Sequence, residues 1–115
     1  MKGTDRFVVD DVVCAVHGAT LKVANISVGG LFAATKSAPP VGEMLEMDVA
    51  LKGRPPFRVT GKVAWINEAE EPKAPDLPQG FGLKIVKIAL PDKVALLDFL
   101  KRAPPTRLKG PTRSR

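Results

Sequence analysis

Residues 45–51 restrict the fold more than any other segment, because apolar and other residues alternate through them without a break. One set is wholly apolar and comprises Leu45, Met47, Val49 and Leu51, and the intervening set comprises Glu46, Asp48 and Ala50. Side chains point to alternate faces of a β-strand, whereas a helix needs a period near 3.6. The segment therefore predicts a strand with one packed face and one wet face, as in an antiparallel sheet.

Five further segments have the composition of short strands, and turn residues separate most of them. They are residues 7–16, 20–26, 31–35, 57–65 and 80–88. The first is rich in valine and is interrupted by Asp10 and Asp11, which predicts a bulge or bend there. In the fourth, Gly61 falls on the apolar face, where the missing side chain permits close backbone contact. Six short strands predict an all-β fold, a small antiparallel barrel.

The C-terminal third is predicted to contain a loop and one helix besides the last strand. Residues 67–79 hold three prolines and four acidic residues without periodicity, which predicts a long exposed loop. A helix is expected to begin at Leu90 and Pro91 and to end before Pro104. Its apolar residues at helical spacing are Val94, Leu96, Leu97 and Leu100. Such a stripe either packs onto its own domain or docks a partner, and packing is the commoner case.

Charge is spread unevenly along the chain. Its 115 residues carry a formal net charge of +6 and suffice for one domain with a modest core. Residues 1–100 contain twelve basic and twelve acidic residues, so they lack the excess of cations that a nucleic-acid-binding domain needs. We expect a domain over residues 1–102 and a disordered basic tail over residues 103–115. That tail either attracts nucleic acid or anionic membrane non-specifically or only solubilises the chain.

Reactive side chains are few. Cys14 and His17 are the only residues of their types, so the chain has no disulfide framework and no local signature of a zinc site or a catalytic triad. We therefore expect a protein that is not an enzyme and that holds no metal or cofactor. No apolar run reaches the length of a membrane span, and the first residues lack a hydrophobic signal segment. A cytoplasmic protein is expected.

Polar and glycine residues between two apolar runs mark the segment 23–32 as the candidate functional turn. A Gly29-Gly30 pair allows positive φ and lets another molecule approach the main chain. Asn25 and Ser27 are two residues apart, so an extended backbone presents their hydrogen-bonding groups on one face. That face can bind a ligand. Alternatively, the asparagine and serine only bond to their own backbone, as in an ordinary polar turn.

The run Asn-Ile-Ser-Val-Gly-Gly at residues 25–30 resembles the (Asp/Asn)-x-Ser-x-x-Gly motif of PilZ domains, which are bacterial receptors for cyclic di-GMP. Other matching features are a basic pair ahead of the motif, Pro-Val-Gly at 40–42, Gly-Lys-Val-Ala-Trp at 61–65 and Gly-Phe-Gly-Leu at 80–83. Together they extend the resemblance over about residues 2–102. It implies a six-stranded antiparallel PilZ-like barrel with one C-terminal α-helix.

The resemblance also implies the ligand-binding residues, with cyclic di-GMP as the ligand. They are Lys2, Arg6, Asn25, Ser27, Gly29 and Gly30. The family places an Arg-x-x-x-Arg pattern before the first strand, and here Lys2 replaces the first arginine. Lysine cannot make the planar bidentate contact of a guanidinium, and losing such a contact costs about 1.5–3 kcal/mol. Trp65 can stack on a base, but its place in an apolar stripe favours core packing.

Two functions are compatible with these features. In the first, the chain is a cyclic di-GMP-responsive regulatory module: the ligand ties the segment bearing Arg6 onto the turn, and the reshaped surface engages a protein effector, in motility or surface behaviour. In the second, the domain does not bind the nucleotide and serves as a protein-interaction adaptor in a motility or type IV pilus system. The sequence identifies neither the partner nor the oligomeric state.

Overall fold

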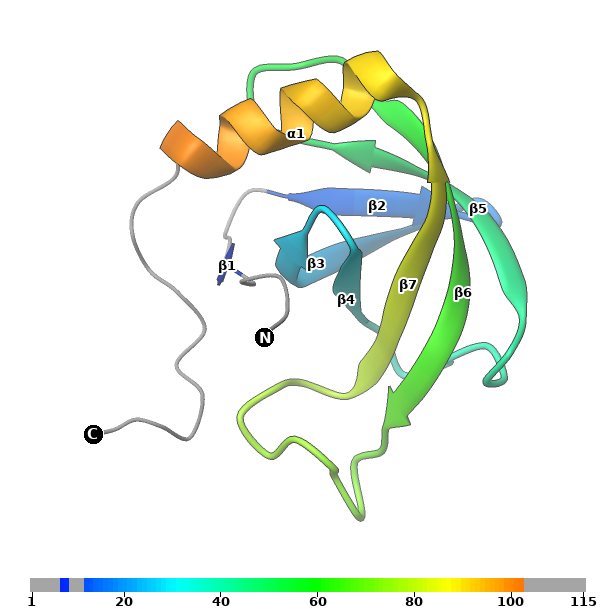
Figure 1. Cartoon of the computed structure of the whole chain (residues 1–115). Coiled ribbons are helices and arrows are strands. Elements are labelled where there is room, and N and C mark those ends of the chain that lie inside the picture. The colour runs from blue at the N-terminus through cyan, green and yellow to red at the C-terminus, as the bar shows by residue number, and fades with distance from the viewer. Residues whose placement is uncertain (1–6, 9–11, 103–115) are drawn as a thin grey trace.

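The computed structural model of the chain describes residues 7–8 and 12–102, which form seven strands and one helix (Figure 1). The elements are β1 (Phe7–Val8), β2 (Val13–Val16), β3 (Ala19–Ser27), β4 (Gly30–Ala34), β5 (Met44–Ala50), β6 (Phe57–Asn67), β7 (Gly80–Ile88) and α1 (Leu90–Arg102). The tail expected over residues 103–115 lies outside the described residues.

The strands form one antiparallel sheet that closes on itself. Neighbours follow the order β1-β3-β2-β5-β6-β7-β4, and a further pairing of β3 with β4 closes six of the strands, β2 to β7, into a barrel. This confirms the predicted six-stranded antiparallel barrel with one C-terminal helix. Closure leaves no long unpaired edge, which is how small all-β domains avoid pairing with other chains.

The first predicted strand, residues 7–16, is present as two short pieces. β2 pairs with the first half of β3, and β1 pairs with its second half, where Phe7 lies opposite Ile26 and Val8 opposite Asn25. β1 ends at Val8 and β2 begins at Val13, and the acidic pair at which a bulge or bend is predicted lies outside the described residues. As a result, β1 lies beside the part of β3 that leads into the candidate turn.

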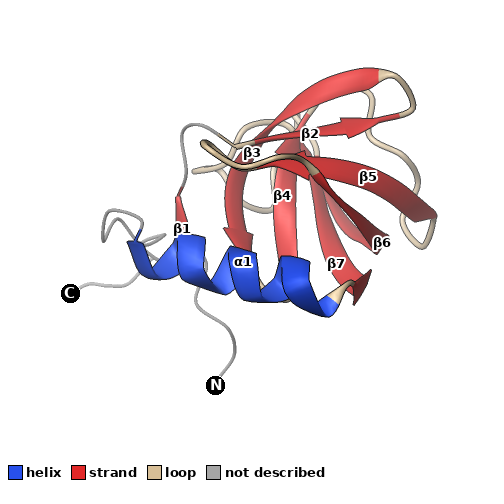
Figure 2. Cartoon of the chain, turned by 90° about the horizontal axis from the view of Figure 1, so that it is seen from above, coloured by secondary structure: helices blue, strands red, loops and turns tan. Residues whose placement is uncertain are grey.

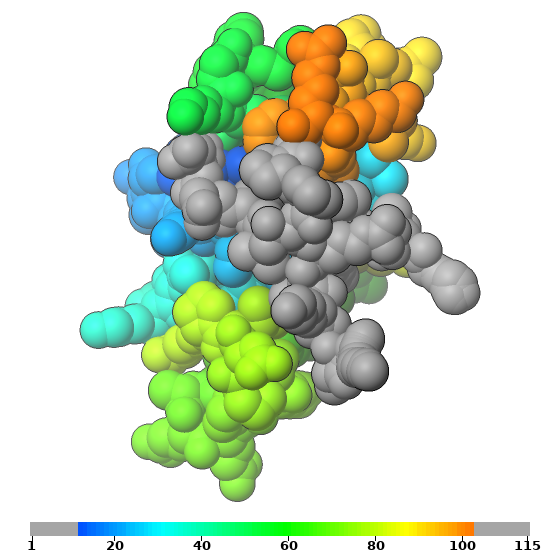
Figure 3. Space-filling model, turned by 90° about the vertical axis from the view of Figure 1, so that its left-hand side faces the viewer, coloured from blue at the N-terminus to red at the C-terminus, as the bar shows by residue number. Residues whose placement is uncertain are grey.

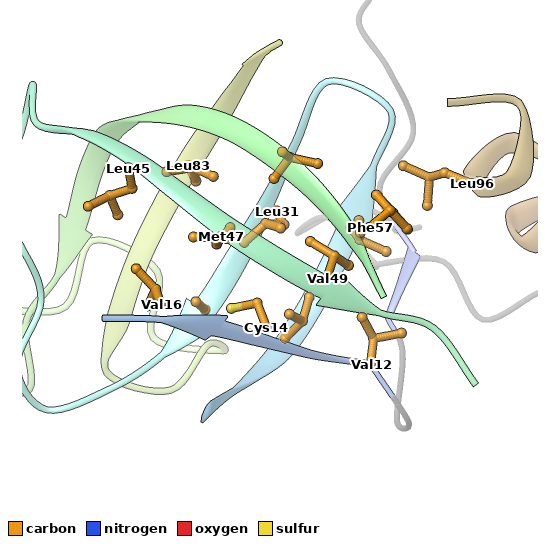
Figure 4. Packing of buried hydrophobic residues seen from close by; sticks show 14 of the residues in the cluster. Val12, Cys14, Val16, Leu31, Leu45, Met47, Val49, Phe57, Leu83 and Leu96 are labelled. Atoms are coloured by element: carbon orange, nitrogen blue, oxygen red, sulfur yellow. The ribbon is translucent and has the colours of Figure 1, made fainter. Parts of the chain in front are cut away.

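A single hydrophobic core fills the barrel and extends to α1. Figure 4 shows side chains from several strands pointing into the barrel, with Leu96 of α1 directed toward Phe57 and Val12. Leu96 is completely buried and Leu100 nearly so. Full burial of one such side chain contributes about 1.5–3 kcal/mol, so these two leucines hold the helix across one end of the barrel (Figure 2).

The helical stripe divides between two environments. Leu96 and Leu100 pack into the core as the commoner interpretation predicts, but Val94 and Leu97 are exposed to 55% and 40%. Leu90 begins the helix, and Pro91 takes the first turn, where its missing N–H costs nothing. No helix within residues 7–8 and 12–102 has the length and apolar character required to cross a bilayer.

At the other end of the barrel, residues 68–79 form the predicted long loop (Figures 1 and 3). A buried side chain at its base organises it: the Asn67 amide donates to the carbonyls of Ala74, Leu77 and Pro78 at 3.0–3.2 Å, and the Ala74 N–H donates back to Asn67 Oδ1 at 2.9 Å. The loop is mostly exposed, yet its path is fixed by four hydrogen bonds to one residue.

Two bulges set which side chains face outward near the candidate turn. Register shifts occur in β3 between Val23 and Asn25 and in β6 between Val63 and Trp65, each adding one residue to its strand. Val23 and Ile26 therefore both lie in the core although they are three residues apart, and the side chain between them, Asn25, lies on the outer face. The bulges are thus what places the motif residues outside the barrel core.

Close backbone approach at Gly61, expected from the sequence, is present. A Cβ at this position would overlap the side chain of Leu83 on β7, so only glycine lets the two strands pack here.

Candidate functional site

Four strands contribute one row of residues across the outer face of the barrel. Asn25 of β3 lies opposite Phe32 of β4, Phe32 opposite Gly82 of β7, and Gly82 opposite Trp65 of β6. Directly opposed residues share a face of the sheet, so these four form a continuous surface, which we call the aromatic row. In this row the Asn25 amide and the Phe32 ring are completely buried, and the Trp65 ring is half-buried.

Gly82 makes the aromatic contact within this row possible. A Cβ there would overlap Nε1 of Trp65, so the indole lies directly over the glycine. The ring reaches across β7 toward Phe32, whose centroid lies 5.3 Å away at an interplanar angle of 43°. Offset and tilted pairs of this kind are favourable, and the half-buried indole keeps part of its surface open to solvent.

The position of Trp65 corrects the sequence prediction of core packing. The bulge after Val63 turns Ile66, instead of Trp65, toward the core, where Ile66 packs against the cluster. The sequence contained a signal for this bulge. Val63 and Ile66 are both apolar but lie three residues apart, which breaks the period of two of a regular strand, and Val23 and Ile26 show the same spacing at the bulge in β3. Phe32 was not predicted as a site residue, and only the pairing of the strands reveals it.

Asn25 is the unusual polar group of the row. Its side chain is completely buried, yet neither Nδ2 nor Oδ1 has a hydrogen-bond partner among the described residues. A buried amide without partners costs about 1–3 kcal/mol relative to a satisfied one. Such groups are rare in native proteins and mark positions where a partner is supplied from elsewhere.

Ser27 is engaged by its own turn. Its Oγ accepts a hydrogen bond from the Gly29 N–H at 3.2 Å and donates to the Gly30 carbonyl at 3.4 Å. The ordinary-turn interpretation thus applies to this hydroxyl, whereas Asn25 makes no such local bond. Ser27 is paired with Gly30 across the hairpin, and the Gly29 carbonyl accepts from Ile85 of β7 at 2.9 Å.

The glycine pair does not adopt the expected positive φ. The described glycines with positive φ are Gly18, Gly42 and Gly53, so the turn at residues 28–29 closes without the left-handed region. Of the predicted site residues, the structure brings together Asn25, Ser27, Gly29 and Gly30 at one hairpin. Lys2 and Arg6 lie outside the described residues.

Two titratable groups with shifted pKa values, Asp48 and Cys14, lie on β5 and β2 and not on the hairpin. Arg58 binds Asp48 at 2.7 Å and Glu46 at 3.4 Å on the outer face of β5 and β6, and its hydrogen bond lowers the pKa of the Asp48 carboxyl. Burial raises the pKa of the Cys14 thiol to about 11, so this sulfur is protonated and unreactive at neutral pH. No three His, Cys, Asp or Glu side chains meet in a metal-binding arrangement within residues 7–8 and 12–102.

This arrangement suits recognition of a planar, hydrogen-bonding ligand. Aromatic faces stack on bases, and an amide offers both a donor and an acceptor to a base edge. Acids, bases and nucleophiles that could perform chemistry on a bound molecule do not line the described part of this face.

Comparison with known proteins agrees with the fold. The PilZ domain family model matches residues 7–102. Among solved structures, the inhibitor of motility MotI/DgrA of Bacillus subtilis is similar, with a TM-score of 0.69 and 22% sequence identity. The match covers 89% of this chain and 50% of that one, so the chain spans about half the length of MotI/DgrA. No curated protein matches by sequence.

Proposed function

Because the chain belongs to the PilZ family, a family of non-enzymatic regulatory and adaptor proteins, we propose that it is a cyclic di-GMP-responsive regulatory module. The ligand would bind on the outer face at the β3–β4 hairpin. A base would stack on the half-buried ring of Trp65, and its edge would bond to Asn25.

One observation carries this proposal: the Asn25 amide is fully buried and has no partner among the described residues. A purely structural asparagine would be expected to bond to the backbone, as Asn67 does four times in this same barrel. A ligand with donors and acceptors on one edge would satisfy both atoms of Asn25. Binding would then remove the free-energy cost of the unsatisfied Asn25 amide, and this gain would add to the affinity for the ligand.

Arg6 is proposed to contact the same ligand, because it precedes a strand that lies beside Asn25. β1 pairs with β3 beside Asn25, and Arg6 directly precedes β1 in the sequence. Only one residue separates Arg6 from Val8, the pairing partner of Asn25, and we propose that the Arg6 guanidinium contacts a phosphate or guanine bound there. Lys2 would add a second, weaker cationic contact, because its ammonium cannot bind bidentately.

We propose that the module acts through a protein partner in the cytoplasm and regulates motility or surface behaviour. MotI/DgrA bears the name of a motility inhibitor, and at 22% identity its likeness to this chain concerns the fold. The alternative is a nucleotide-free adaptor in a motility or type IV pilus system. It is favoured by Ser27, whose hydroxyl is already used by its own turn.

Calorimetric titration of the full chain with cyclic di-GMP tests the proposal. We expect saturable binding near micromolar affinity, with the dissociation constant raised at least about tenfold in Asn25→Ala and in Arg6→Ala, since each change removes a direct polar contact. Cyclic di-AMP serves as the ligand control, because adenine presents a different edge. Absence of heat at high ligand concentration would support the adaptor instead.

A further inference from the structure

A pair of lysines lies on the outer face directly beside the aromatic row. Lys62 of β6 is opposite Lys84 of β7, and Lys84 is opposite Gly30 of β4, which in turn pairs with Ser27. Gly30 and Lys84 are each two residues from a member of the aromatic row, so the two rows run about 7 Å apart along the strands. Both lysines are exposed. We call Lys62 and Lys84 the lysine pair.

Neither member of the lysine pair has a carboxylate partner among the described residues. The nearest outward acids on β5 are Glu46 and Asp48, and both bind Arg58 instead. The residue of β5 directly opposite Lys62 is the uncharged Met44. Four cations, Arg58, Lys62, Lys84 and Lys87, thus lie on the outward faces of β6 and β7, and only Arg58 is bound by carboxylates of the described residues.

Like charges directly opposite on neighbouring strands repel each other and destabilise a sheet. The repulsion disappears if an anion lies between the two ammonium groups, because each then gains a charge-assisted hydrogen bond. Gly30 has no side chain, so only backbone lies between Ser27 and Lys84 in this row. The surface is therefore suited to a small anion carried by a ligand that also contacts Asn25.

We propose that the lysine pair binds a phosphodiester group of the ligand whose base lies on the aromatic row. This inference rests on the proposed function and assigns Lys62 and Lys84 a role in binding that the motif does not contain. A phosphodiester bears one negative charge and two free oxygens, one for each ammonium. The pair supplies positive charge at the ligand that does not depend on the basic pair at the start of the chain.

The test compares a double substitution with a matched control in the full chain. Lys62→Met with Lys84→Met removes the pair, and Lys73→Met with Lys101→Met removes two exposed lysines of the loop at residues 68–79 and of α1 at equal change of net charge. In calorimetry with cyclic di-GMP, the first variant should raise the dissociation constant about tenfold or more and reduce its dependence on salt, while the control stays within about twofold. Equal affinity in the first variant and the wild type would overturn the proposal.

Two further readouts separate this proposal from a structural role and from the proposed function. Without ligand, Lys62→Met with Lys84→Met should melt at the same or a higher temperature, because the repulsion is gone; a purely structural role would lower it. Inorganic pyrophosphate should raise the melting temperature of the wild type more than that of this variant. If cyclic di-GMP gives no heat but pyrophosphate still stabilises the wild type more than this variant, the lysine pair is an anion site and the proposed function is wrong. Equal pyrophosphate effects on both proteins would contradict the lysine pair.

Discussion

Asn25 and Asn67 are both buried asparagines in strands of this barrel, and they differ in their partners. Asn67 makes four hydrogen bonds to the loop at residues 68–79, whereas Asn25 makes none to any described residue. Buried amides are stabilising only when they are satisfied. Asn67 therefore serves the fold, and Asn25 is the asparagine that we assign to the ligand.

Alanine substitution at the two positions should therefore have unequal effects on stability. Asn67→Ala removes the partners of three carbonyls and one N–H and should lower the free energy of unfolding by about 2–4 kcal/mol. Asn25→Ala removes two unsatisfied atoms and should change it by less than about 1 kcal/mol in the absence of ligand. Urea denaturation measures both. A loss in Asn25→Ala as large as that in Asn67→Ala would show that the Asn25 amide is satisfied within the protein.

Among the elements, β3 and β6 carry information that alternation could not provide. Helical spacing predicted the helix, and alternating residues predicted the strands, because packed and wet faces impose a period of two on a sheet. They did not predict the bulges, since an inserted residue keeps both flanking segments regular and only shifts their phase. This is why Trp65 was assigned to the core, and why Phe32 and Gly82 were missed as parts of the site.

The contact between β6 and β7 gives a prediction at this scale. Gly82→Ala places a methyl group where Nε1 of Trp65 now lies, so the indole must leave its position over β7. We expect the free energy of unfolding to fall by about 1–3 kcal/mol and the emission of the folded protein to shift toward that of a more exposed indole. Trp65 is the only tryptophan of the chain, so emission reports on this contact alone.

Gly61→Ala is the matched control, because its methyl group would meet Leu83 on the inner side of the barrel. It should also lower stability, but it should leave the emission of the folded protein unchanged. Unaltered emission in Gly82→Ala would contradict the arrangement of the aromatic row.

At the scale of the whole molecule, closure of the barrel brings together parts of the site that are far apart in sequence. β3 and β4 supply Asn25, Ser27 and Phe32, and β6 and β7, about forty residues later, supply Trp65 and the lysine pair. The motif residues were predictable from sequence, because turn chemistry and the family resemblance are local. The aromatic row and the lysine pair depend on strand register across the barrel, which a linear pattern does not encode.

The central claim is that cyclic di-GMP binds on the outer face at Asn25 and Trp65, and the emission of Trp65 during a titration with this nucleotide tests it most directly. We predict a saturable change of emission whose midpoint agrees with the calorimetric dissociation constant, and whose midpoint moves to higher ligand concentration in Asn25→Ala. Emission that stays constant through ligand concentrations that saturate the heat signal would place the nucleotide elsewhere and contradict the account.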